Sequence, residues 1–389
     1  MWLFMVVAYV VFQATDSEES LGGTHLNPQE FMTISEIIQY WGYPSEEYQV
    51  PTEDGYYLQV NRIPYGVHSP GKTGPRPAVL IVHGISSEGR HWIANIPNNS
   101  LGLFLADAGY DVWLLNCRGN TWSRRHETLS VDQEQFWNFS FHEMGIYDVP
   151  ATIHFILEKT QQDGLYYIGH SQGASIGLIA FSVMPQLGQK IKLFMCFAPA
   201  YTFGLSTVQT SVLIPDGIIW LIFGKKEFNY CSNKMKASLA KLCSHAVIDE
   251  FCLLRFSVYC TENLNVTRAD VYVGIDPDYN SVKTIIHWKQ IARSCEFQYY
   301  DYGCKNKAVY NSTTPPLYKI EDMIVPTAVW SGAKDTTIDY RNVKQLLPRI
   351  KHLVFYENVP YWGHMDFVWG LDAPKRLYPD MLNLMDKYQ

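Results

Sequence analysis

The pentapeptide Gly169-His170-Ser171-Gln172-Gly173 constrains this chain more than any other feature, because of the segments on either side of it. The apolar run 165–168 before it is typical of a buried strand, and the small apolar residues 174–181 after it suit a buried helix. Strand, G-x-S-x-G and helix together are the context of a nucleophile elbow, a turn so tight that glycines must flank it. Such a turn lifts the Ser171 hydroxyl above the edge of a sheet, where it can act as a nucleophile.

A serine nucleophile needs a base to take its proton and a carboxylate to orient that base. On an elbow of this kind the acid precedes the histidine in the chain. His364 lies in the turn-rich segment 360–366 beyond a strand-like run, where active sites of open α/β sheets collect. His352 opens the strand-like run 352–356, where its ring would face a sheet surface or solvent. We therefore expect His364 to be the general base; the other histidines after the elbow are His245 and His287.

Three aspartates compete for the role of the acid. Asp335 follows the strand-like run 327–331 through a short turn. Asp322 precedes that strand and so belongs to the opposite end of the sheet. Asp339 stands where a helix is expected to begin, and an aspartate there is most often a cap or first-turn residue. The predicted triad is therefore Ser171, Asp335 and His364.

Two backbone N–H groups must stabilise the oxyanion that forms when a serine attacks a carbonyl. Gln172, the residue after the nucleophile, supplies one of them. The other is expected from Ile85, because the loop 83–85 directly follows the apolar run 78–82, which is typical of a fully buried strand. His83 in the same loop either assists the reaction or only braces the loop, and the second interpretation is favoured.

Strands and helices alternate between about residue 75 and residue 200, an order that builds a mostly parallel sheet with helices on both faces. The alternation stops between residues 201 and 324 and then resumes to residue 389. We therefore expect an α/β core in two parts, residues 20–200 and 325–389, with residues 201–324 inserted as a cap or lid.

Several sequence blocks beyond the pentapeptide stand in a fixed order along the chain. Together they resemble the acid lipase family, which includes gastric and lysosomal acid lipases. The resemblance implies an α/β-hydrolase fold, and the family's serine, aspartate and histidine match Ser171, Asp335 and His364. The blocks are Asn27-Pro28, Ile34-Ser35-Glu36-Ile37-Ile38, Tyr40-Trp41-Gly42-Tyr43-Pro44, Thr52-Glu53-Asp54-Gly55-Tyr56, Asn61-Arg62-Ile63-Pro64, residues 105–113 and Arg118-Gly119-Asn120-Thr121-Trp122-Ser123.

The chain departs from the family at some positions near the expected site. It has Val82-His83-Gly84-Ile85 where Gln-His-Gly-Leu is usual, and Cys117 stands where the family has the serine of Asn-Ser-Arg-Gly-Asn. Ala174-Ser175 replaces a usual Thr-Thr pair, and the loop 86–90 is more polar than usual. None of these changes removes a catalytic group, but together they bear on substrate preference.

By this resemblance the protein is expected to be a secreted serine lipase that hydrolyses carboxyl esters of long-chain fatty acids, triacylglycerol or steryl ester, through an acyl-enzyme. No cofactor or metal is needed for that chemistry. Because one fold hosts many reactions, the alternatives are an esterase or thioesterase of another substrate class, and a catalytically weak secreted lipid-binding protein. The apolar run 213–223 either lines the acyl site and docks on a transient lipid interface as a lid, or packs on the cap's own core.

The first twelve residues are apolar, too few to span a bilayer, and acidic residues follow them, as in a secretory signal. We expect residues 1–19 to be a signal peptide, no stable transmembrane anchor elsewhere, and a secreted protein, with the lysosome as the alternative. N-glycosylation sequons, which belong to the secretory pathway, support this expectation. They start at Asn98, Asn138, Asn265 and Asn311.

The resemblance also implies a disulfide between Cys243 and Cys252 and a free thiol at Cys260. Any pairing among Cys231, Cys295 and Cys304 stays open. No C-x-x-C or paired Cys/His spacing predicts a zinc site. A formal net charge of −7 without a basic run argues against a nucleic-acid partner, so the expected partners are a lipid ester and a lipid surface.

Overall fold

The computed structural model describes residues 27–67, 74, 76–203, 215–228, 233–244 and 263–389. A nine-stranded sheet forms its centre, in the order β1-β2-β4-β3-β6-β7-β10-β11, with β5 paired to β2. Strand β2 is antiparallel to β1, β4 and β5, and all the other neighbours are parallel. The strands are β1 (Glu46–Pro51), β2 (Tyr56–Ile63), β3 (Ala78–Val82), β4 (Asp111–Leu115), β5 (Arg125–His126), β6 (Leu165–His170), β7 (Ile191–Phe197), β10 (Thr327–Gly332) and β11 (Leu353–Val359).

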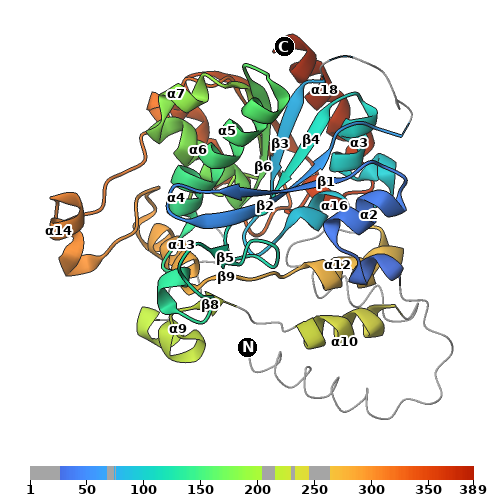
Figure 1. Ribbon diagram of the computed structural model, residues 1–389. Helices are drawn as coiled ribbons and strands as arrows, with labels where there is room; N and C mark the ends of the chain where they lie inside the picture. The colour runs from blue at the N-terminus through green and yellow to red at the C-terminus, as the bar shows by residue number, and fades with distance from the viewer. Residues whose placement is uncertain (1–26, 68–73, 75, 204–214, 229–232, 245–262) are drawn as a thin grey trace.

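Helices cover both faces of the sheet (Figure 1), so the predicted α/β class with a mostly parallel sheet is confirmed. Strand β3 shows why its residues form this arrangement: all five are apolar and buried. Leu80 and Val82 pack in one hydrophobic cluster with α5 and α6, while Val79 and Ile81 pack in a second cluster with α2, α3 and α18. A parallel strand covered on both faces is expected to read as a continuous apolar run. The helices named here are α2 (Ile34–Tyr40), α3 (Leu101–Asp107), α5 (Val149–Thr160), α6 (Gln172–Val183) and α18 (Tyr378–Lys387).

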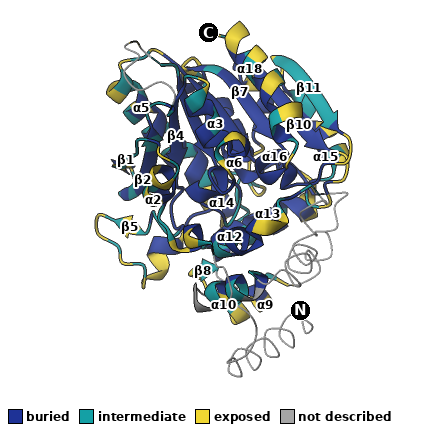
Figure 2. Cartoon of the chain, turned by 90° about the vertical axis from the view of Figure 1, so that its right-hand side faces the viewer, coloured by how far each residue is buried: buried dark blue, intermediate teal, exposed yellow. Residues whose placement is uncertain are grey.

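Further helices complete the two layers that cover the sheet. Buried residues concentrate along the sheet and along the helix faces that touch it (Figure 2). The first hydrophobic cluster also includes residues of α4, α7 and α15, and the second includes residues of α16 and α17. Their bounds are α4 (Phe141–Glu143), α7 (Pro185–Gly188), α15 (Tyr340–Leu346), α16 (Asp366–Trp369) and α17 (Ala373–Arg376).

The described residues between 201 and 324 contribute no strand to the main sheet. Their helices gather at one end of it, below the sheet in Figure 1, while α14 projects to one side. Two short strands, β8 and β9, pair with each other among these helices. The domain boundaries predicted at residues 201 and 324 remain predictions. The elements are α9 (Asp216–Phe223), β8 (Glu227–Phe228), α10 (Asn233–Cys243), α12 (Ala269–Ile275), β9 (Asn280–Ser281), α13 (Val282–Ser294) and α14 (Asn306–Tyr310).

A buried arginine ties the loop after β4 to two distant segments. The Arg118 Nε atom donates to Asp148 Oδ1 at 2.7 Å, and Nη2 donates to Asp54 Oδ1 at 2.8 Å. The guanidinium also lies over the Tyr56 ring, 4.0 Å from its centroid. Burial raises the pKa of Asp148 to about 6, although Arg118 opposes the shift. Removing Arg118 would leave this carboxylate buried and unpaired, which typically costs about 3–5 kcal/mol.

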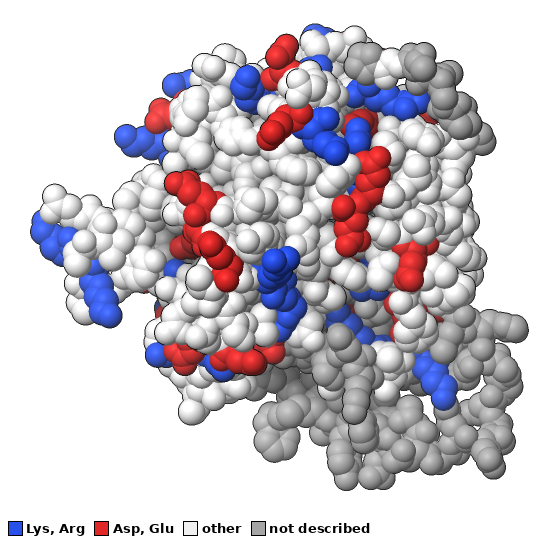
Figure 3. Space-filling model, in the orientation of Figure 1, with Lys and Arg blue, Asp and Glu red and all other residues white. Residues whose placement is uncertain are grey.

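The surface carries acidic and basic side chains interspersed, with broad uncharged areas between them on the face drawn in Figure 3. Within the described ranges, no helix combines the length and apolar character needed to cross a bilayer.

The raised pKa of one buried carboxyl group, that of Glu30, predicts that the folded protein gains stability at acidic pH. Burial, followed by the nearby Asp270 charge, raises the pKa of Glu30 to about 7, with Arg90 partly opposing the shift. An unfolded glutamate titrates near 4.3, so only the folded state holds this proton between about pH 4.3 and pH 7. Glu30 therefore supports folding below about pH 4.3, and this contribution is lost as the pH rises through 7.

Replacing Glu30 with Gln, which mimics the protonated group, should raise the melting temperature by about 3 °C at pH 8 and leave it unchanged near pH 4. Differential scanning calorimetry at both pH values measures this. Glu36→Gln is the control, because hydrogen bonds from Thr33 lower the pKa of exposed Glu36, so this change should give no gain at pH 8. Equal shifts of the Glu30→Gln variant at both pH values would contradict the prediction.

Candidate active site

Ser171 stands at the turn between β6 and α6 with an unusual backbone conformation, φ 53° and ψ −120°. The neighbouring glycines explain how the chain reaches it. A Cβ atom on Gly169 would lie 2.5 Å from the Ala174 nitrogen, and one on Gly173 would lie 2.3 Å from the Val82 carbonyl oxygen. No side chain fits at either position. The strand, tight turn and helix expected from the pentapeptide are therefore present, with strain of about 1–3 kcal/mol stored at the serine.

Asp335 and His364 form a buried pair beside this turn. His364 Nδ1 lies 2.8 Å from Asp335 Oδ2. The other carboxylate oxygen, Oδ1, accepts the backbone N–H groups of Thr337 at 2.8 Å and Ile338 at 2.7 Å. Each oxygen thus has its own partner, which fixes the carboxylate so that Oδ2 faces the imidazole. A carboxylate at Nδ1 selects the tautomer that leaves Nε2 free to accept a proton.

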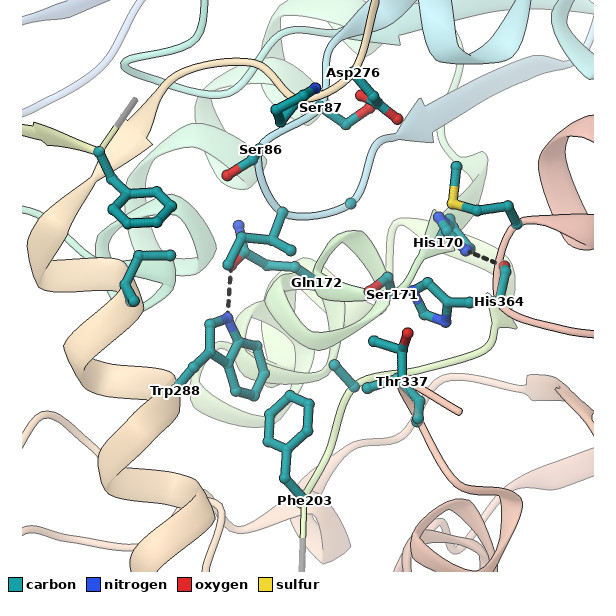
Figure 4. Close-up of a pocket in the computed structure, with 18 of the residues that line it drawn as sticks. Ser86, Ser87, His170, Ser171, Gln172, Phe203, Asp276, Trp288, Thr337 and His364 are labelled. Atoms are coloured by element: carbon teal, nitrogen blue, oxygen red, sulfur yellow. Dashed lines mark hydrogen bonds between the residues drawn. The ribbon is translucent and has the colours of Figure 1, made fainter. Parts of the chain in front are cut away.

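The loops that carry Asp335 and His364 meet because Gly332 has no side chain. A Cβ atom there would lie 2.4 Å from the Trp362 carbonyl oxygen. The Lys334 N–H group donates to the same oxygen at 2.8 Å, which joins the loop after β10 to the loop after β11. Figure 4 shows the Ser171 side chain beside the His364 ring. Because Asp335 contacts the same ring, the three predicted triad residues lie together at the carboxyl ends of the parallel strands.

The rival candidates lie elsewhere. His352 is exposed and precedes β11, at the opposite end of the strand from His364. His287 is buried in α13, where its ring nitrogens contact the Ser140 hydroxyl and the Gln298 carbonyl oxygen. Asp339 caps α15 by accepting the Arg341 N–H group at 2.8 Å, as its position in the sequence predicts. Asp322 lies before β10, and His245 lies outside the described residues.

The loop after β3 passes directly against the nucleophile. A Cβ atom on Gly84 would lie 3.3 Å from Ser171 Cβ, and the next residue, Ile85, lines the cavity beside it. Gln172 is the first residue of α6, so its N–H group points out of the helix without an intrahelical acceptor. The two predicted oxyanion donors therefore flank Ser171.

His83 has the bracing contacts of a structural residue. Its Nε2 atom accepts the Cys117 N–H group at 3.1 Å, and its Nδ1 atom lies 2.8 Å from the Gly84 carbonyl oxygen. Burial lowers the pKa of His83 to about 4, so the ring is neutral near neutral pH. These contacts join the Ile85 loop to the loop after β4.

A cavity of about 440 Å³ opens above Ser171. Trp288 of α13 reaches it and donates from Nε1 to Gln172 Oε1 at 2.7 Å, which holds the Gln172 side chain to one side (Figure 4). Of the apolar wall residues, the sequence singled out only Ile219, within the run 213–223; it did not identify Trp288 or the others, because they come from the irregular segment 201–324. Their only signal is apolar spacing, which a plain core also produces. The apolar wall includes Phe203, Ile219, Phe228, Ile285, Trp288 and Ala292.

Other predicted sites have mixed outcomes in the described part of the chain. Cys243 is disulfide-bonded, and its predicted partner Cys252 lies outside the described residues, as do Cys231 and Cys260. Cys295 and Cys304 are free thiols, so they form no bridge with each other. Among the described residues, no group of three or more His, Cys, Asp or Glu side chains could hold a metal ion. The sequon residues Asn98, Asn138 and Asn311 are exposed, and Asn265 is half-buried.

Comparison with known proteins identifies the family to which the chain belongs. A family described as "Partial alpha/beta-hydrolase lipase region" matches residues 34–96, and one described as "alpha/beta hydrolase fold" matches residues 77–203. Human lysosomal acid lipase/cholesteryl ester hydrolase is 47% identical over 397 residues, covering 100% of this chain and 99% of that protein. Human gastric triacylglycerol lipase is 43% identical over 396 residues, with 100% of this chain and 99% of that protein covered.

Human lipase member M is 46% identical over 394 residues, covering 100% of this chain and 93% of that protein. Among solved structures, an α/β-hydrolase from Penicillium aligns with a TM-score of 0.55 at 12% identity, covering 89% of this chain and 99% of that one. The likeness to the Penicillium structure concerns the fold alone. From its sequence relatives, the chain belongs to the acid lipase family of α/β-hydrolases, which are carboxylic ester hydrolases.

Proposed function

We propose that this protein is a secreted serine lipase that hydrolyses carboxyl esters of long-chain fatty acids, in glycerides or steryl esters, through the Ser171-His364-Asp335 triad. The observation that carries the proposal is the position of Ser171, on a strained elbow beside the His364–Asp335 pair and at the floor of a mostly apolar cavity. A lipid-binding protein has no need for either the strained turn or the buried contact between His364 and Asp335.

The reaction begins when His364 Nε2 takes the Ser171 proton and Oγ forms a bond to the ester carbonyl carbon. The carbonyl electrons move onto the oxygen, where the Ile85 and Gln172 N–H groups stabilise the negative charge. The carbon–alkoxy bond then breaks, and the proton on His364 passes to the departing alcohol. Water repeats the sequence on the acyl-enzyme: His364 takes its proton, the fatty acid leaves, and Ser171 recovers its hydrogen.

The apolar end of the cavity suits a fatty acyl chain. Phe203 and Trp288 stack edge to face at its base, with ring centroids 5.2 Å apart. Ile219 of α9 is buried and also lines the cavity. Burial of each methylene of an acyl chain against such walls contributes about 0.8 kcal/mol. Long-chain esters should therefore bind better than short ones, which distinguishes a lipase from a small-ester esterase.

Helix α9 lines this cavity through Ile219 and presents other apolar side chains to solvent. Leu221 is 85% exposed and Ile222 is 54% exposed, while Ile219 on the opposite side packs inward. Asp216 at the helix start holds Lys289 of α13 at 2.8 Å. Within the described residues 216–223, one side of the helix packs on α13 and the other is exposed, which supports the interpretation as a surface for lipid. We propose that α9 docks on the substrate interface.

The secretory pathway is the proposed location, either outside the cell or in the lysosome. The exposed sequon residues Asn98, Asn138 and Asn311 are accessible to glycosylation, and the disulfide at Cys243 suits an oxidising compartment.

The nucleophile assignment predicts that Ser171→Ala lowers kcat on a long-chain ester by about 10⁴–10⁶-fold, because the acyl-enzyme cannot form. A fluorophosphonate probe should label the wild type at one site and leave Ser171→Ala unlabelled. The control is Ser175→Ala, one turn further along α6, where labelling should persist. Labelling of the Ser171→Ala protein at wild-type level would exclude Ser171 as the nucleophile.

The acid assignment predicts that Asp335→Asn lowers kcat by about 10⁴-fold, because the amide no longer selects the required His364 tautomer. Asp339→Asn removes a charge four residues away that caps α15 and pairs with Arg341, so its kcat should stay near that of the wild type. Steady-state hydrolysis of one soluble ester by both variants measures the difference. The reverse ranking would assign the acid to Asp339.

If α9 docks on the lipid interface, the double change Leu221→Ser and Ile222→Ser should lower hydrolysis of a triolein emulsion by about tenfold or more. The reason is that adsorption loses two apolar side chains that would be buried in the lipid. Hydrolysis of a soluble short-chain ester should be unaffected, since neither residue lines the cavity. Val309→Ser on α14, another exposed apolar residue, is the control. Equal losses on both substrates would indicate misfolding and reject interfacial docking by α9.

A further inference from the structure

One side of the active-site cavity is polar, in contrast to the apolar walls around it. It is formed by the loop after β3, the residue before the nucleophile and the segment after α12. We name these residues the polar wall: Ser87, His91, His170 and Asp276. The proposed hydrolysis assigns none of them a role.

The members of the polar wall are connected to one another and to the triad. His91 Nδ1 lies 2.8 Å from the Ser87 hydroxyl and 3.3 Å from Asp276 Oδ2. The His91 ring stacks on His170, with centroids 5.5 Å apart, and the His170 ring lies 4.7 Å from that of His364. His170 Nε2 donates to the His364 carbonyl oxygen at 2.9 Å. The polar wall therefore begins next to His364, the proposed general base, and extends away from it.

Three buried atoms of this wall have no hydrogen-bond partner among the described residues: His91 Nε2, His170 Nδ1 and Asp276 Oδ1. A buried polar atom without a partner is unfavourable, and most native proteins contain few of them. Three such atoms on one wall of one cavity need partners from what the cavity holds, which is water before binding and a ligand afterwards.

The hydrogen-bonding character of the three atoms follows from their neighbours. Burial lowers the pKa of His170 well below its usual range, so the ring is neutral. Because Nε2 carries the proton donated to His364, Nδ1 is an acceptor. His91 Nδ1 faces the Asp276 carboxylate and so carries a proton, and the tautomer whose only proton is there offers Nε2 as an acceptor. Asp276 Oδ1 is a third acceptor, and the wall therefore requires a ligand with hydrogen-bond donors.

The wall is held in place by contacts outside the cavity. The Asp278 N–H group donates to the Ser86 carbonyl oxygen at 2.6 Å, which joins the segment of Asp276 to the loop of Ser87. The Asp278 carboxylate in turn accepts the Thr121 N–H group at 2.9 Å. Because its position is fixed before binding, little conformational entropy is lost when a ligand meets it.

The direction of the reaction decides which part of an ester meets the wall. His364 must deliver its proton to the departing alcohol, so the alcohol lies on the His364 side of Ser171. Figure 4 shows Ser87 and Asp276 on one side of Ser171 and Phe203 and Trp288 on the other. The acyl chain therefore extends toward the aromatic side, and the alcohol extends along the polar wall.

We propose that the polar wall binds the alcohol portion of the ester and selects alcohols that keep free hydroxyl groups, as in monoacylglycerols, over alcohols without a second hydroxyl, such as methanol or a sterol. The inference rests on the proposed ester hydrolysis and narrows its substrate class. The two free hydroxyls of a monoacylglycerol supply donors to two of the three acceptor atoms, whereas a sterol would leave all three without a donor.

The test compares kcat/KM for 1-monooleoylglycerol, methyl oleate and cholesteryl oleate in the same detergent micelles, so that the acyl chain is constant and only the alcohol varies. The wild type should favour monooleoylglycerol over methyl oleate by about tenfold or more, the fold-change expected from one or two hydrogen bonds. His91→Phe keeps the ring and removes both nitrogens, and it should bring this ratio close to one. His352→Phe, the same exchange at an exposed site, should leave the ratio unchanged.

A second variant keeps the test decisive if His91→Phe does not fold. In Asp276→Asn the amide oxygen stays toward His91, so the NH₂ group replaces the unpaired acceptor, and the ratio should again fall. A wild-type ratio near one, or variants that slow all three oleates equally, would overturn the inference. Absence of turnover on every oleate together with absent fluorophosphonate labelling would instead overturn the proposed hydrolysis itself.

Discussion

The backbone of Ser171 is the constraint on which the rest of the site depends. Its φ of 53° is unfavourable for a residue with a side chain, and the turn persists only because Gly169 and Gly173 allow the chain to pack against itself and against β3. The same close packing brings the loop of Gly84 to within van der Waals contact of the serine. One strained residue thus fixes the nucleophile and the proposed oxyanion donors together.

The other half of the site depends on a second close approach between chain segments. Gly332 ends β10 against the Trp362 carbonyl oxygen, and this contact sets the distance between the Asp335 and His364 loops. The carboxylate is then oriented by two backbone N–H groups and not by a side chain that could rotate. In both halves of the site, therefore, a glycine permits two chain segments to approach closely, and backbone groups define the positions of the catalytic residues. Side chains elsewhere are left free to vary.

The sequence predicted those parts of the molecule that local patterns determine. The apolar run 78–82 coincides with β3, and Asp339 caps a helix as its position suggests, because burial on both sheet faces and helix capping are local demands. The run 352–356 identified β11 but not its end at Val359, since that edge strand is only half-buried and carries polar residues. Trp288 could not be placed, because its contact with Gln172 depends on how α13 packs over the sheet.

The polar wall shows most clearly what the sequence could not reveal. The loop 86–90 stood out as unusually polar, but polarity in a loop normally indicates exposure to solvent. Here Ser87 and His91 are buried, and His91 meets Asp276, a residue from a distant part of the chain, in the same cavity as the serine. Burying polar groups is unfavourable unless they form hydrogen bonds, so these atoms need hydrogen-bond partners when the enzyme acts. The triad supplies no partner for these atoms, and in the proposed reaction the alcohol of the ester replaces cavity water as their partner.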